Sequence, residues 1–349
     1  MLQDSSSTKT RARLEDVARE ADVSVATVDR VLNKRPGVRA ATVEKVHEAV
    51  ARLDYRPDAA AARLARSRDY RVCFVLPSGS NSFVTLLRQQ IAENHAWMAD
   101  QRLAAETIEV DVFEPRTLAD QLRALGKKCD GVVVMALDHP LVKDAIDELV
   151  DQGVAVITLV SDVPSSKRQH FVGIDNVAAG RTAATLVGRF IKKSRGTVGI
   201  VVGSLSLRDH AERCFGFNQV MSAEYQELVV LSPVEGKDDA KRTKKVTQEL
   251  LALHPKLDAI YSVGAGNSGI AACLKESGKG SSIVFVGHEL SRQSRADLLD
   301  GTMDAVINQD AGHEVRSALR LAYAHVAQET VRANQERIRI DIYLKDNLP

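Results

Sequence analysis

The sequence predicts a small all-α head followed by a larger α/β body, in which two doubly wound parallel sheets form two lobes. Three observations carry this prediction. The first part of the chain contains only short amphipathic helical patterns, and from Arg71 onward Val- and Ile-rich runs alternate with longer helical ones. These apolar runs outnumber the roughly ten strands that one open sheet accommodates. A chain of 349 residues is also long enough for about two domains.

The head is predicted at residues 11–57, as three small helices around one core. In the second helical pattern, "VATVDRVLN", Val28, Val31 and Leu32 recur at helical spacing, and Ser24 can cap the helix start. The third pattern, "AATVEKVHEAVARLDY", also carries its apolar residues on one face. Three such helices can share a core, although a domain of this size is only marginally stable.

Charge is spread unevenly along the chain. The formal net charge is +1, but residues 1–71 hold 15 Lys and Arg against 11 Asp and Glu, whereas the remaining residues hold 32 against 35. The head and its linker therefore carry +4 and the rest of the chain −3. A basic head on a slightly acidic body indicates a polyanionic partner for the head.

The outer face of the second helix has the geometry of a DNA-reading helix. Opposite the apolar stripe lie Val25, Ala26, Asp29, Arg30 and Asn33. In a helix-turn-helix the first helix braces the second, which presents its outer face to base edges in the major groove. There Arg30 can contact a guanine and Asn33 a base or a phosphate. The alternative interpretation is an ordinary three-helix cap with a solvated polar face.

The head sequence "LEDVAREADVSVATVDRVLNKRPGVRAATVEKVHEAVARLDYRPDAAAARLA" resembles the DNA-binding head of the LacI/GalR family of bacterial transcription regulators, without a break from Leu14 to Ala65. The resemblance implies a sequence-specific regulator of the repressor kind that binds double-stranded operator DNA as a homodimer or higher oligomer. The residues expected on the DNA are Ser24, Val25, Ala26, Thr27, Asp29, Arg30, Asn33, Arg39, Tyr55 and Leu64.

Residues 58–69 are predicted to be a hinge helix and linker. An isolated helix of about eight residues is unstable in water, so we expect the hinge to become helical only on DNA. The resemblance implies that Leu64 wedges into the minor groove, as an apolar side chain that kinks DNA does. Asp29 and Arg39 stand where the family commonly has serine. Asp29 places a carboxylate close to the phosphate backbone, and Arg39 gains a phosphate contact while the third helix loses a cap.

The body, residues 70–349, resembles the periplasmic sugar-binding proteins that form the effector domain of this family. The resemblance implies two lobes, about 70–172 with 306–330 and about 173–305 with 331–349. It also implies that a sugar or sugar-like molecule bound between them controls operator affinity. Candidate ligand contacts lie in the loops at the strand ends: Asn81, Phe83, Asp138, Ser161, Asp162, Arg208, Asp209, Arg213, Asn267, Glu289 and Gln309.

These candidates are not equivalent. Arg213 matches the ligand-binding arginine of the family best. Asp138 and Asp162 can equally well cap a helix or turn, and Val160 occupies a slot where the family commonly has an aspartate. Asp175 and Asn176 are expected to form a helix-capping turn rather than to bind the ligand.

Residues 264–269, "GAGNSG", raise a competing hypothesis. Three glycines between a strand and a helix, with Glu289 about twenty residues further on, match a dinucleotide-binding fingerprint. Such a fingerprint usually belongs to the first strand–helix turn of its domain, whereas this one lies late in the second lobe. We therefore interpret it as a ligand loop and expect neither an enzyme nor a cofactor. An NAD-dependent oxidoreductase and a non-secreted sugar-binding protein remain as alternatives.

The remaining features concern cysteines and targeting. Cys73, Cys129, Cys214 and Cys273 show no metal-ligand or redox spacing, so we expect buried thiols rather than a disulfide or a metal site. Residues 1–10, rich in Ser and Thr, are expected to be a disordered leader. The N-terminus lacks a signal-peptide core and no apolar run approaches ~18 residues, so we expect no membrane association and a cytoplasmic, nucleoid-associated protein.

Overall fold

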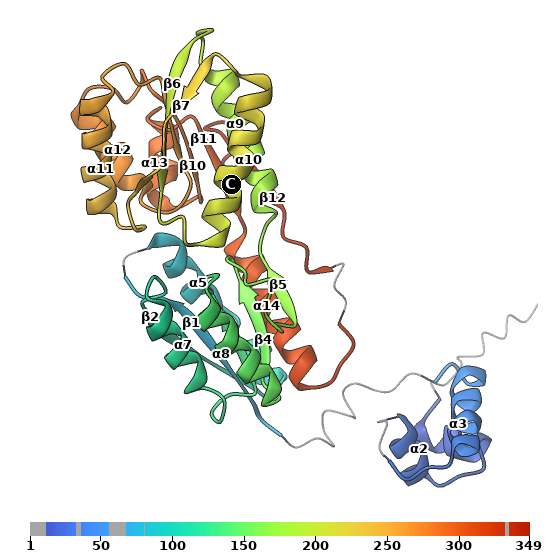
Figure 1. Ribbon diagram of the computed structural model, residues 1–349. Helices are drawn as coiled ribbons and strands as arrows, with labels where there is room; N and C mark the ends of the chain where they lie inside the picture. The colour runs from blue at the N-terminus through green and yellow to red at the C-terminus, as the bar shows by residue number, and fades with distance from the viewer. Residues whose placement is uncertain (1–11, 33–35, 56–67, 80, 332–334) are drawn as a thin grey trace, which may run out of the picture. The chain divides into compact units, whose positions relative to one another are not determined.

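The structure, a computed structural model, describes residues 12–32, 36–55, 68–79, 81–331 and 335–349 (Figure 1). The predicted leader, most of the predicted hinge, and the predicted DNA contacts Asn33 and Leu64 lie outside these residues. The chain divides into two compact units, Met1–Arg68 and Asp69–Pro349, and each is described by itself.

The head consists of the three predicted helices, α1 (Leu14–Glu20), α2 (Val25–Leu32) and α3 (Ala40–Arg52). One side chain from each helix is completely buried at the centre: Val17, Val28 and Val46. Ser24 caps α2 as predicted, because its Oγ accepts a hydrogen bond of 3.2 Å from the Thr27 amide. The apolar face of each helix therefore points into one small core.

The first lobe of the body is built on a five-stranded sheet with the order β2-β1-β3-β4-β5, in which every pair is parallel. Side chains of β1 alternate between the two faces, as strand geometry requires. Phe74 and Leu76 pack with α5 and α14, whereas Val75 packs with α7 and α8. The strands are β1 (Tyr70–Pro77), β2 (Leu103–Val110), β3 (Gly131–Val134), β4 (Ala155–Leu159) and β5 (His170–Val172), and the helices are α5 (Ser82–Glu93), α6 (His95–Asp100), α7 (Pro115–Arg123), α8 (Pro140–Asp151) and α14 (Ala311–Val326).

The second lobe has a seven-stranded sheet with the order β12-β11-β10-β9-β6-β7, and β8 pairs with β6. All its pairs are parallel except β11 with β12. The helices α11, α12 and α13 cover one face, and α9 and α10 the other (Figure 1). The strands are β6 (Gly196–Val202), β7 (Leu228–Val230), β8 (Val234–Glu235), β9 (Ala259–Ser262), β10 (Val284–His288), β11 (Ala305–Gln309) and β12 (Ile340–Tyr343); the helices are α9 (Asn176–Phe190), α10 (Arg208–Glu224), α11 (Ala240–Leu253), α12 (Asn267–Glu276) and α13 (Arg292–Leu299).

The structure places one boundary between the lobes differently from the sequence analysis. We expected the chain to return to the first lobe at about residue 306, but β11 pairs with β10 and belongs to the second sheet. The return follows Gln309, where Asp310 caps α14 by accepting a hydrogen bond from the His313 amide. Gln309 therefore lies at the end of a second-lobe strand, directly before a first-lobe helix.

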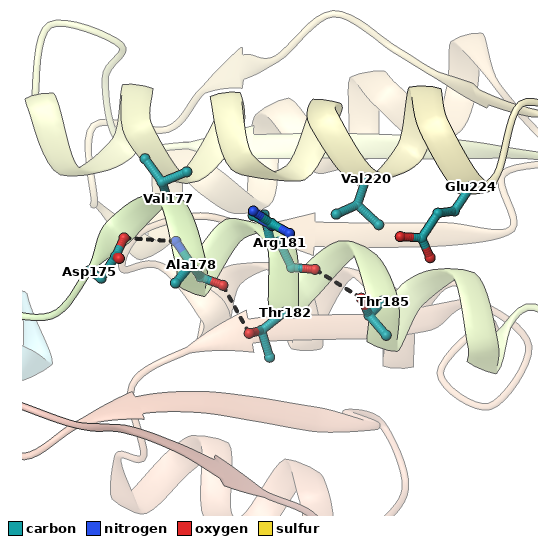
Figure 2. A pocket seen from close by; sticks show the side chains of 8 residues that line it. All are labelled: Asp175, Val177, Ala178, Arg181, Thr182, Thr185, Val220 and Glu224. Atoms are coloured by element: carbon teal, nitrogen blue, oxygen red, sulfur yellow. Dashed lines mark hydrogen bonds between the residues drawn. The ribbon is translucent and has the colours of Figure 1, made fainter.

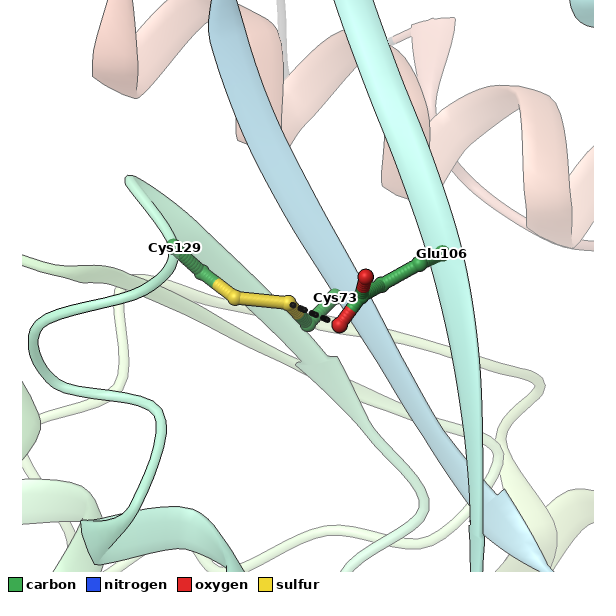
Figure 3. A group of neighbouring side chains, drawn as sticks. All are labelled: Cys73, Glu106 and Cys129. Atoms are coloured by element: carbon green, nitrogen blue, oxygen red, sulfur yellow. Dashed lines mark hydrogen bonds between the residues drawn. A yellow bond between two sulfur atoms is a disulfide. The ribbon is translucent and has the colours of Figure 1, made fainter.

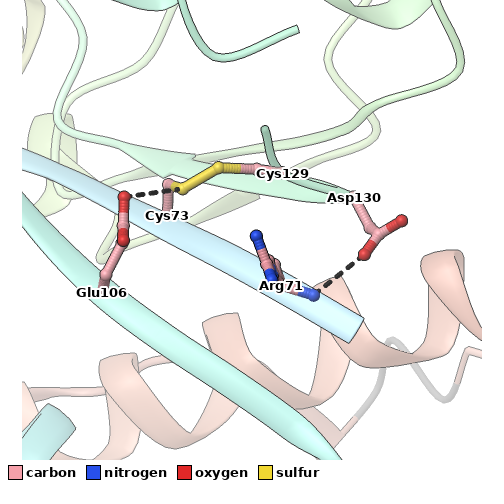
Figure 4. The surroundings of a disulfide bond; sticks show 5 residues. All are labelled: Arg71, Cys73, Glu106, Cys129 and Asp130. Carbon is pink, nitrogen blue, oxygen red and sulfur yellow. Dashed lines mark hydrogen bonds between the residues drawn. A yellow bond between two sulfur atoms is a disulfide. The ribbon is translucent and has the colours of Figure 1, made fainter. Parts of the chain in front are cut away.

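The expectation of four free thiols is wrong for two of the cysteines. Cys73 on β1 and Cys129, just before β3, form a disulfide with a Cα–Cα distance of 6.3 Å (Figure 3). Strand pairing brings the two segments together, because Cys73 lies opposite Val132 in the β1–β3 register, three residues after Cys129. The Arg71 amide also donates a hydrogen bond of 2.9 Å to the Asp130 carboxylate (Figure 4). Cys214 and Cys273 are buried free thiols, as expected.

No helix within the described part of the chain is both long and apolar enough to cross a membrane.

Candidate DNA-reading face and effector site

The outer face of α2 presents the residues that the sequence analysis expects on DNA. Ser24, Val25, Ala26 and Arg30 are exposed, and 42% of the Val25 surface is accessible although it is an apolar side chain. Thr27 and Asp29 are half-buried. The exposed face of α2 thus begins with the small apolar residues Val25 and Ala26 and ends with the polar residue Arg30. This arrangement is typical of a helix whose first residues approach DNA bases.

Two further predicted DNA contacts flank the third helix. Arg39 is exposed at the N-cap position of α3, where its side chain makes no capping hydrogen bond. The arginine thus leaves the helix uncapped, as expected from its replacement of a serine. Tyr55 is half-buried against the head core.

In the body, a set of buried polar side chains gathers where β10 and β11 end. We call it the polar cluster, and it comprises Asp209, Arg213, Asn267, His288, Glu289, Gln309 and Glu314. Each has at least one buried side-chain nitrogen or oxygen atom with no hydrogen-bond partner among the described residues. Buried polar atoms nearly always have partners in folded proteins. The concentration of such atoms in one place marks a site that can bind a polar molecule.

Arg213 is the cation of the polar cluster and is held rigidly. Its side chain is 2% exposed. Nε donates a hydrogen bond of 2.8 Å to the Asn176 side chain, and Nη1 donates one of 2.9 Å to the Val263 carbonyl. Nη2 lies 4.0 Å from Oε1 of Glu289 and has no hydrogen-bond partner in the described part of the chain. The guanidinium therefore presents one free edge toward Glu289.

Glu289 follows β10 directly and adopts a left-handed backbone conformation with φ of 70°. Its Oε1 accepts a hydrogen bond of 2.8 Å from the Gln309 side chain. Burial raises the pKa of Glu289 to about 7, although Arg213 and Gln309 oppose the shift. The carboxyl group is therefore close to half-ionised near neutral pH.

A second layer supports these residues. The Nε2 atom of His288 lies 2.8 Å from the Tyr261 hydroxyl, and the Tyr261 ring stacks on Phe217 with centroids 4.7 Å apart. Burial lowers the pKa of His288 well below its usual value, so the imidazole is neutral. Asn267, the first residue of α12, donates a hydrogen bond of 2.6 Å to the His288 carbonyl.

The structure brings five of the eleven predicted ligand residues into the polar cluster, namely Asp209, Arg213, Asn267, Glu289 and Gln309. Ser161 is 1% exposed and its hydroxyl also lacks a partner, but it lies after β4 in the first lobe. Asp138 and Arg208 form an ion pair of 3.0 Å that joins the first lobe to the second.

The remaining predicted contacts have structural roles. The Asn81 side chain caps α5 by accepting a hydrogen bond of 2.9 Å from the Phe83 amide, and Phe83 is buried in the core. Asp162 pairs with the Arg168 guanidinium and accepts hydrogen bonds from Thr158 and the Val163 amide. A ligand contact from Asn81, Phe83 or Asp162 stays a prediction, because the hydrogen bonds and core packing just described account for these side chains without a ligand.

Sequence reasoning missed three residues of this region. Asp175 caps α9 as expected, but Asn176 also orients Arg213, so the interpretation of this pair as a capping turn is incomplete. His288 had no partner with recognisable spacing, and Glu314 lies inside an apolar helical pattern. The one signal in the sequence is that Glu314 is an acidic residue at a position where the helical pattern of α14 places buried side chains.

The "GAGNSG" glycines are used for packing within the body. A Cβ atom on Gly264 would lie 2.6 Å from the His210 imidazole, and one on Gly266 would lie 2.5 Å from the Thr243 hydroxyl. A Cβ atom on Gly269 would lie 2.2 Å from the Ala240 carbonyl oxygen. The three glycines therefore allow α10 and α11 to pack closely against this turn, a role that requires no dinucleotide.

Two other features do not form this site. Cys73, Cys129 and Glu106 lie close enough together to hold a metal ion, but the two sulfurs are joined to each other (Figure 3). A pocket of about 350 Å³ lies between α9 and α10 (Figure 2). It contains no predicted ligand residue, and its lining consists of Asp175, Val177, Ala178, Arg181, Thr182, Thr185, Val220 and Glu224.

The chain thus combines a helical head that exposes one face of α2 with a two-lobed body that contains a buried polar cluster. Comparison with known proteins specifies the class. Residues 13–58 match the family "Bacterial regulatory proteins, lacI family", and residues 72–330 match "Periplasmic binding protein domain". The chain belongs to the lacI family of regulators, with a periplasmic-binding-protein-like body.

Curated relatives support this assignment. Catabolite control protein A of Priestia megaterium is 31% identical over 247 residues, which cover 70% of this chain and 72% of that protein. Catabolite control protein A of Staphylococcus aureus (strain MRSA252) is 28% identical over 213 residues, which cover 61% of this chain and 62% of the relative. The match to the latter thus spans less than two thirds of its length.

Solved structures confirm the predicted fold of the body. A glucose-galactose binding protein from Geobacillus stearothermophilus has a TM-score of 0.71 and 21% identity, and the match covers 81% of this chain and all of that one. An ABC transporter solute binding protein from Agrobacterium vitis, bound with α-D-tagatopyranose, has a TM-score of 0.72 and 19% identity over 80% of this chain and 96% of that one. At these identities the likeness concerns the fold alone.

Proposed function

We propose that this protein is a sequence-specific transcription regulator of the repressor kind, and that a sugar or sugar-like molecule held between its two lobes controls its affinity for operator DNA. A homodimer that acts on chromosomal DNA in the cytoplasm is part of this proposal. The observation that carries it is the combination of a lacI-type head with a body that gathers buried polar atoms at the ends of β10 and β11.

Support for DNA reading comes from α2. Val28 and Val31 are buried in the head core, so the opposite side of the helix with Val25, Ala26 and Arg30 is available to a base edge. Arginine recognises guanine through two hydrogen bonds in the major groove. A single small head has too little surface for tight specific binding, so we expect a dimer on a pseudo-palindromic site.

Support for a sugar comes from the chemistry of the polar cluster. Carboxylate, amide and guanidinium groups are planar, and each can exchange more than one hydrogen bond with neighbouring hydroxyl groups. Arg213, Glu289 and Gln309 supply one group of each kind within a short distance of one another. Solute binding proteins with the same fold carry α-D-tagatopyranose and D-arabinose in their solved structures.

Contacts between the lobes give a ligand a means of control. Asp138 of the first lobe pairs with Arg208 of the second, and Lys237 of the second lies 5.1 Å from the centre of the Phe113 ring of the first. A ligand changes operator affinity only if it binds one arrangement of the lobes better than the other. Because both contacts join the two lobes, we expect them to break when the lobes move apart.

The test begins with selection of duplexes from a randomised pool by the full chain, followed by operator titration in the presence of sugars, sugar alcohols and sugar phosphates. We expect enrichment of a pseudo-palindrome and a change in affinity with at least one compound. Absence of any sequence preference would contradict DNA reading. A response to nicotinamide dinucleotide alone would favour the oxidoreductase alternative.

A further inference from the structure

The polar cluster offers more hydrogen-bond acceptors than donors. Among the described residues, its unpartnered buried oxygens belong to five side chains: Asp209, Asn267, Glu289, Gln309 and Glu314. The one unpartnered nitrogen that must donate is Nη2 of Arg213. The Nδ1 atom of His288 donates or accepts according to the tautomer. Burial raises the pKa of both Glu314 and Glu289, and each adds one donor when it is protonated. The acceptors still outnumber the donors, so a molecule that satisfies this cluster must bring hydrogen-bond donors.

The charged groups of the polar cluster also favour an uncharged ligand. The negative or potentially negative groups are Asp209, Glu289 and Glu314, with Asp310 at the cap of α14 and Asp238 beside His210. The basic groups that face them are Arg213 and His210, whose Nε2 lies 3.6 Å from Oδ2 of Asp209. Arg208 is engaged by Asp138 and Glu212, and His288 is neutral. Burial and the nearby Glu289 raise the pKa of Glu314 well above its usual value. Even with Glu314 protonated, Glu289 faces Arg213 at 4.0 Å and Asp209 and Asp238 face His210, so neither basic group is left without a carboxyl neighbour for an anion to replace.

Glu314 is the residue of the polar cluster that belongs to the first lobe. It lies on α14, whose residues Val315, Ala318 and Leu319 are completely buried in the core with the first sheet. Its own side chain is 0% exposed, and neither carboxyl oxygen has a hydrogen-bond partner within the residues that the structure describes. Arg213 and Glu289 belong to the second lobe. A ligand that touches Glu314 and Glu289 together therefore touches both lobes.

We propose that the effector is a polyol without an anionic group, and that Glu314 is its contact from the first lobe. This inference rests on the proposed function and specifies the ligand class of the same site. Hydroxyl groups supply the donors that the cluster lacks, whereas a phosphate or carboxylate would be buried among like charges and unpaired acceptors.

The ligand class is tested with the full chain and a matched panel. For each of several skeletons (pentoses, hexoses, hexitols and inositols) the neutral compound is compared with its phosphate and its acid. Binding is followed by the thermal midpoint through the fluorescence of Trp97, the single tryptophan of the chain, which packs against Tyr323 of the body. We expect the midpoint to rise only with neutral members.

Two results would overturn the ligand class. One is a phosphate or acid that binds at least as tightly as its neutral counterpart, and the other is a panel without any neutral ligand. If no neutral compound of the panel binds but the protein still selects a specific duplex, the proposed DNA reading stands and this inference alone fails. If it selects none, the proposed function fails as well.

The role of Glu314 is tested with Glu314→Leu. Because the substitution removes a buried carboxyl group without partners, we expect the free protein to melt at a higher temperature. The affinity for the neutral ligand should fall about tenfold or more, since the hydroxyls facing Glu314 lose their partner. Unchanged affinity would overturn the contact.

Asp297→Leu is the matched control. Asp297 is also completely buried, but its Oδ1 accepts a hydrogen bond of 2.6 Å from Lys275, and only Oδ2 has no partner among the described residues. It lies on α13, which packs with α11 and α12, and within the described ranges its side chain makes no hydrogen bond with the polar cluster. We expect this variant to melt at a lower temperature and to bind the neutral ligand like the wild type. Equal loss of affinity in both variants would show that the effect of Glu314→Leu is structural and would overturn the assignment.

Discussion

The side chain of Gln309 donates a 2.8 Å hydrogen bond to one carboxyl oxygen of Glu289, and the other oxygen, Oε2, has no partner among the described residues. Gln309 ends β11 and Glu289 follows β10, so two adjacent parallel strands orient the carboxyl group from two sides. Because the pair is buried, the protonation of Glu289 is coupled to folding.

Glu289 makes the stability of the body depend on pH. Its pKa rises from 4.5 to about 7 on folding, so its stabilising contribution is complete below about pH 4.5 and is lost as the pH rises through about 7. The shift corresponds to about 3 kcal/mol. We expect Glu289→Gln to reduce the fall in unfolding free energy between about pH 5 and about pH 8, measured by urea titration with Trp97 fluorescence. Glu249→Gln, at an exposed site, is the control, and an unchanged slope in Glu289→Gln would contradict the assignment.

The second prediction concerns the contact of α9 with α10. A Cβ atom on Gly180 would lie 1.9 Å from the carbonyl oxygen of Arg213, which is backbone and cannot rotate away. Gly180→Ala should therefore force the helices apart, lower stability by about 1–3 kcal/mol and displace Arg213. Gly280→Ala is the control, because a Cβ atom there meets nothing closer than 3.6 Å. Equal stability of the two variants in urea unfolding would show that the helices do not pack this closely.

The third prediction concerns the disulfide between Cys73 and Cys129, which closes a loop with a sequence separation of 56. On the chain-entropy model, closing a loop of this length stabilises the fold by about 4 kcal/mol. We expect a reductant to lower the unfolding free energy of the wild type but not that of Cys129→Ser. A wild type that is equally stable with and without reductant would show that the cross-link contributes nothing.

The fourth prediction concerns DNA recognition by Arg30. Arg30→Ala should cost about 1–3 kcal/mol and relax the preference at one base pair of each half-site. Arg19→Ala, at an exposed position of α1, should leave the preference unchanged. Duplex selection with the three proteins measures the effect. The same preference in wild type and Arg30→Ala would exclude a base contact.

Periodicity in the sequence predicted the fold because it reports burial directly. The alternation of Val72, Phe74 and Leu76 with Cys73 and Val75 follows from a strand covered on both faces. Contacts between distant segments leave no such pattern. The disulfide, the Asn176 support for Arg213, and the place of β11 in the second sheet depend on strand order, which appears only in three dimensions.

The candidate site was predicted in part for the same reason. Parallel strands end at one edge of a sheet, so Glu289 and Gln309 could be expected to lie together. Glu314 could not, because its helix packs on the other lobe and its apolar neighbours give it the sequence pattern of a core helix. Helix ends are equally hard to read from the sequence: between Asn81 and Leu103 the chain forms two helices, α5 and α6, and Leu103 begins β2. The Asn94 side chain donates to the Gln90 carbonyl at the end of α5, a capping contact that periodicity does not show.

The central claim is that a polar molecule bound by Arg213 controls DNA binding by the head. The most direct measurement is operator affinity, with and without the active compound, for the wild type and Arg213→Ala. We expect equal affinity without the compound, because the substitution does not touch the head. The variant should require about ten- to a hundred-fold more compound for the same response, since a charged hydrogen bond to it is lost. A variant that responds like the wild type would contradict the account.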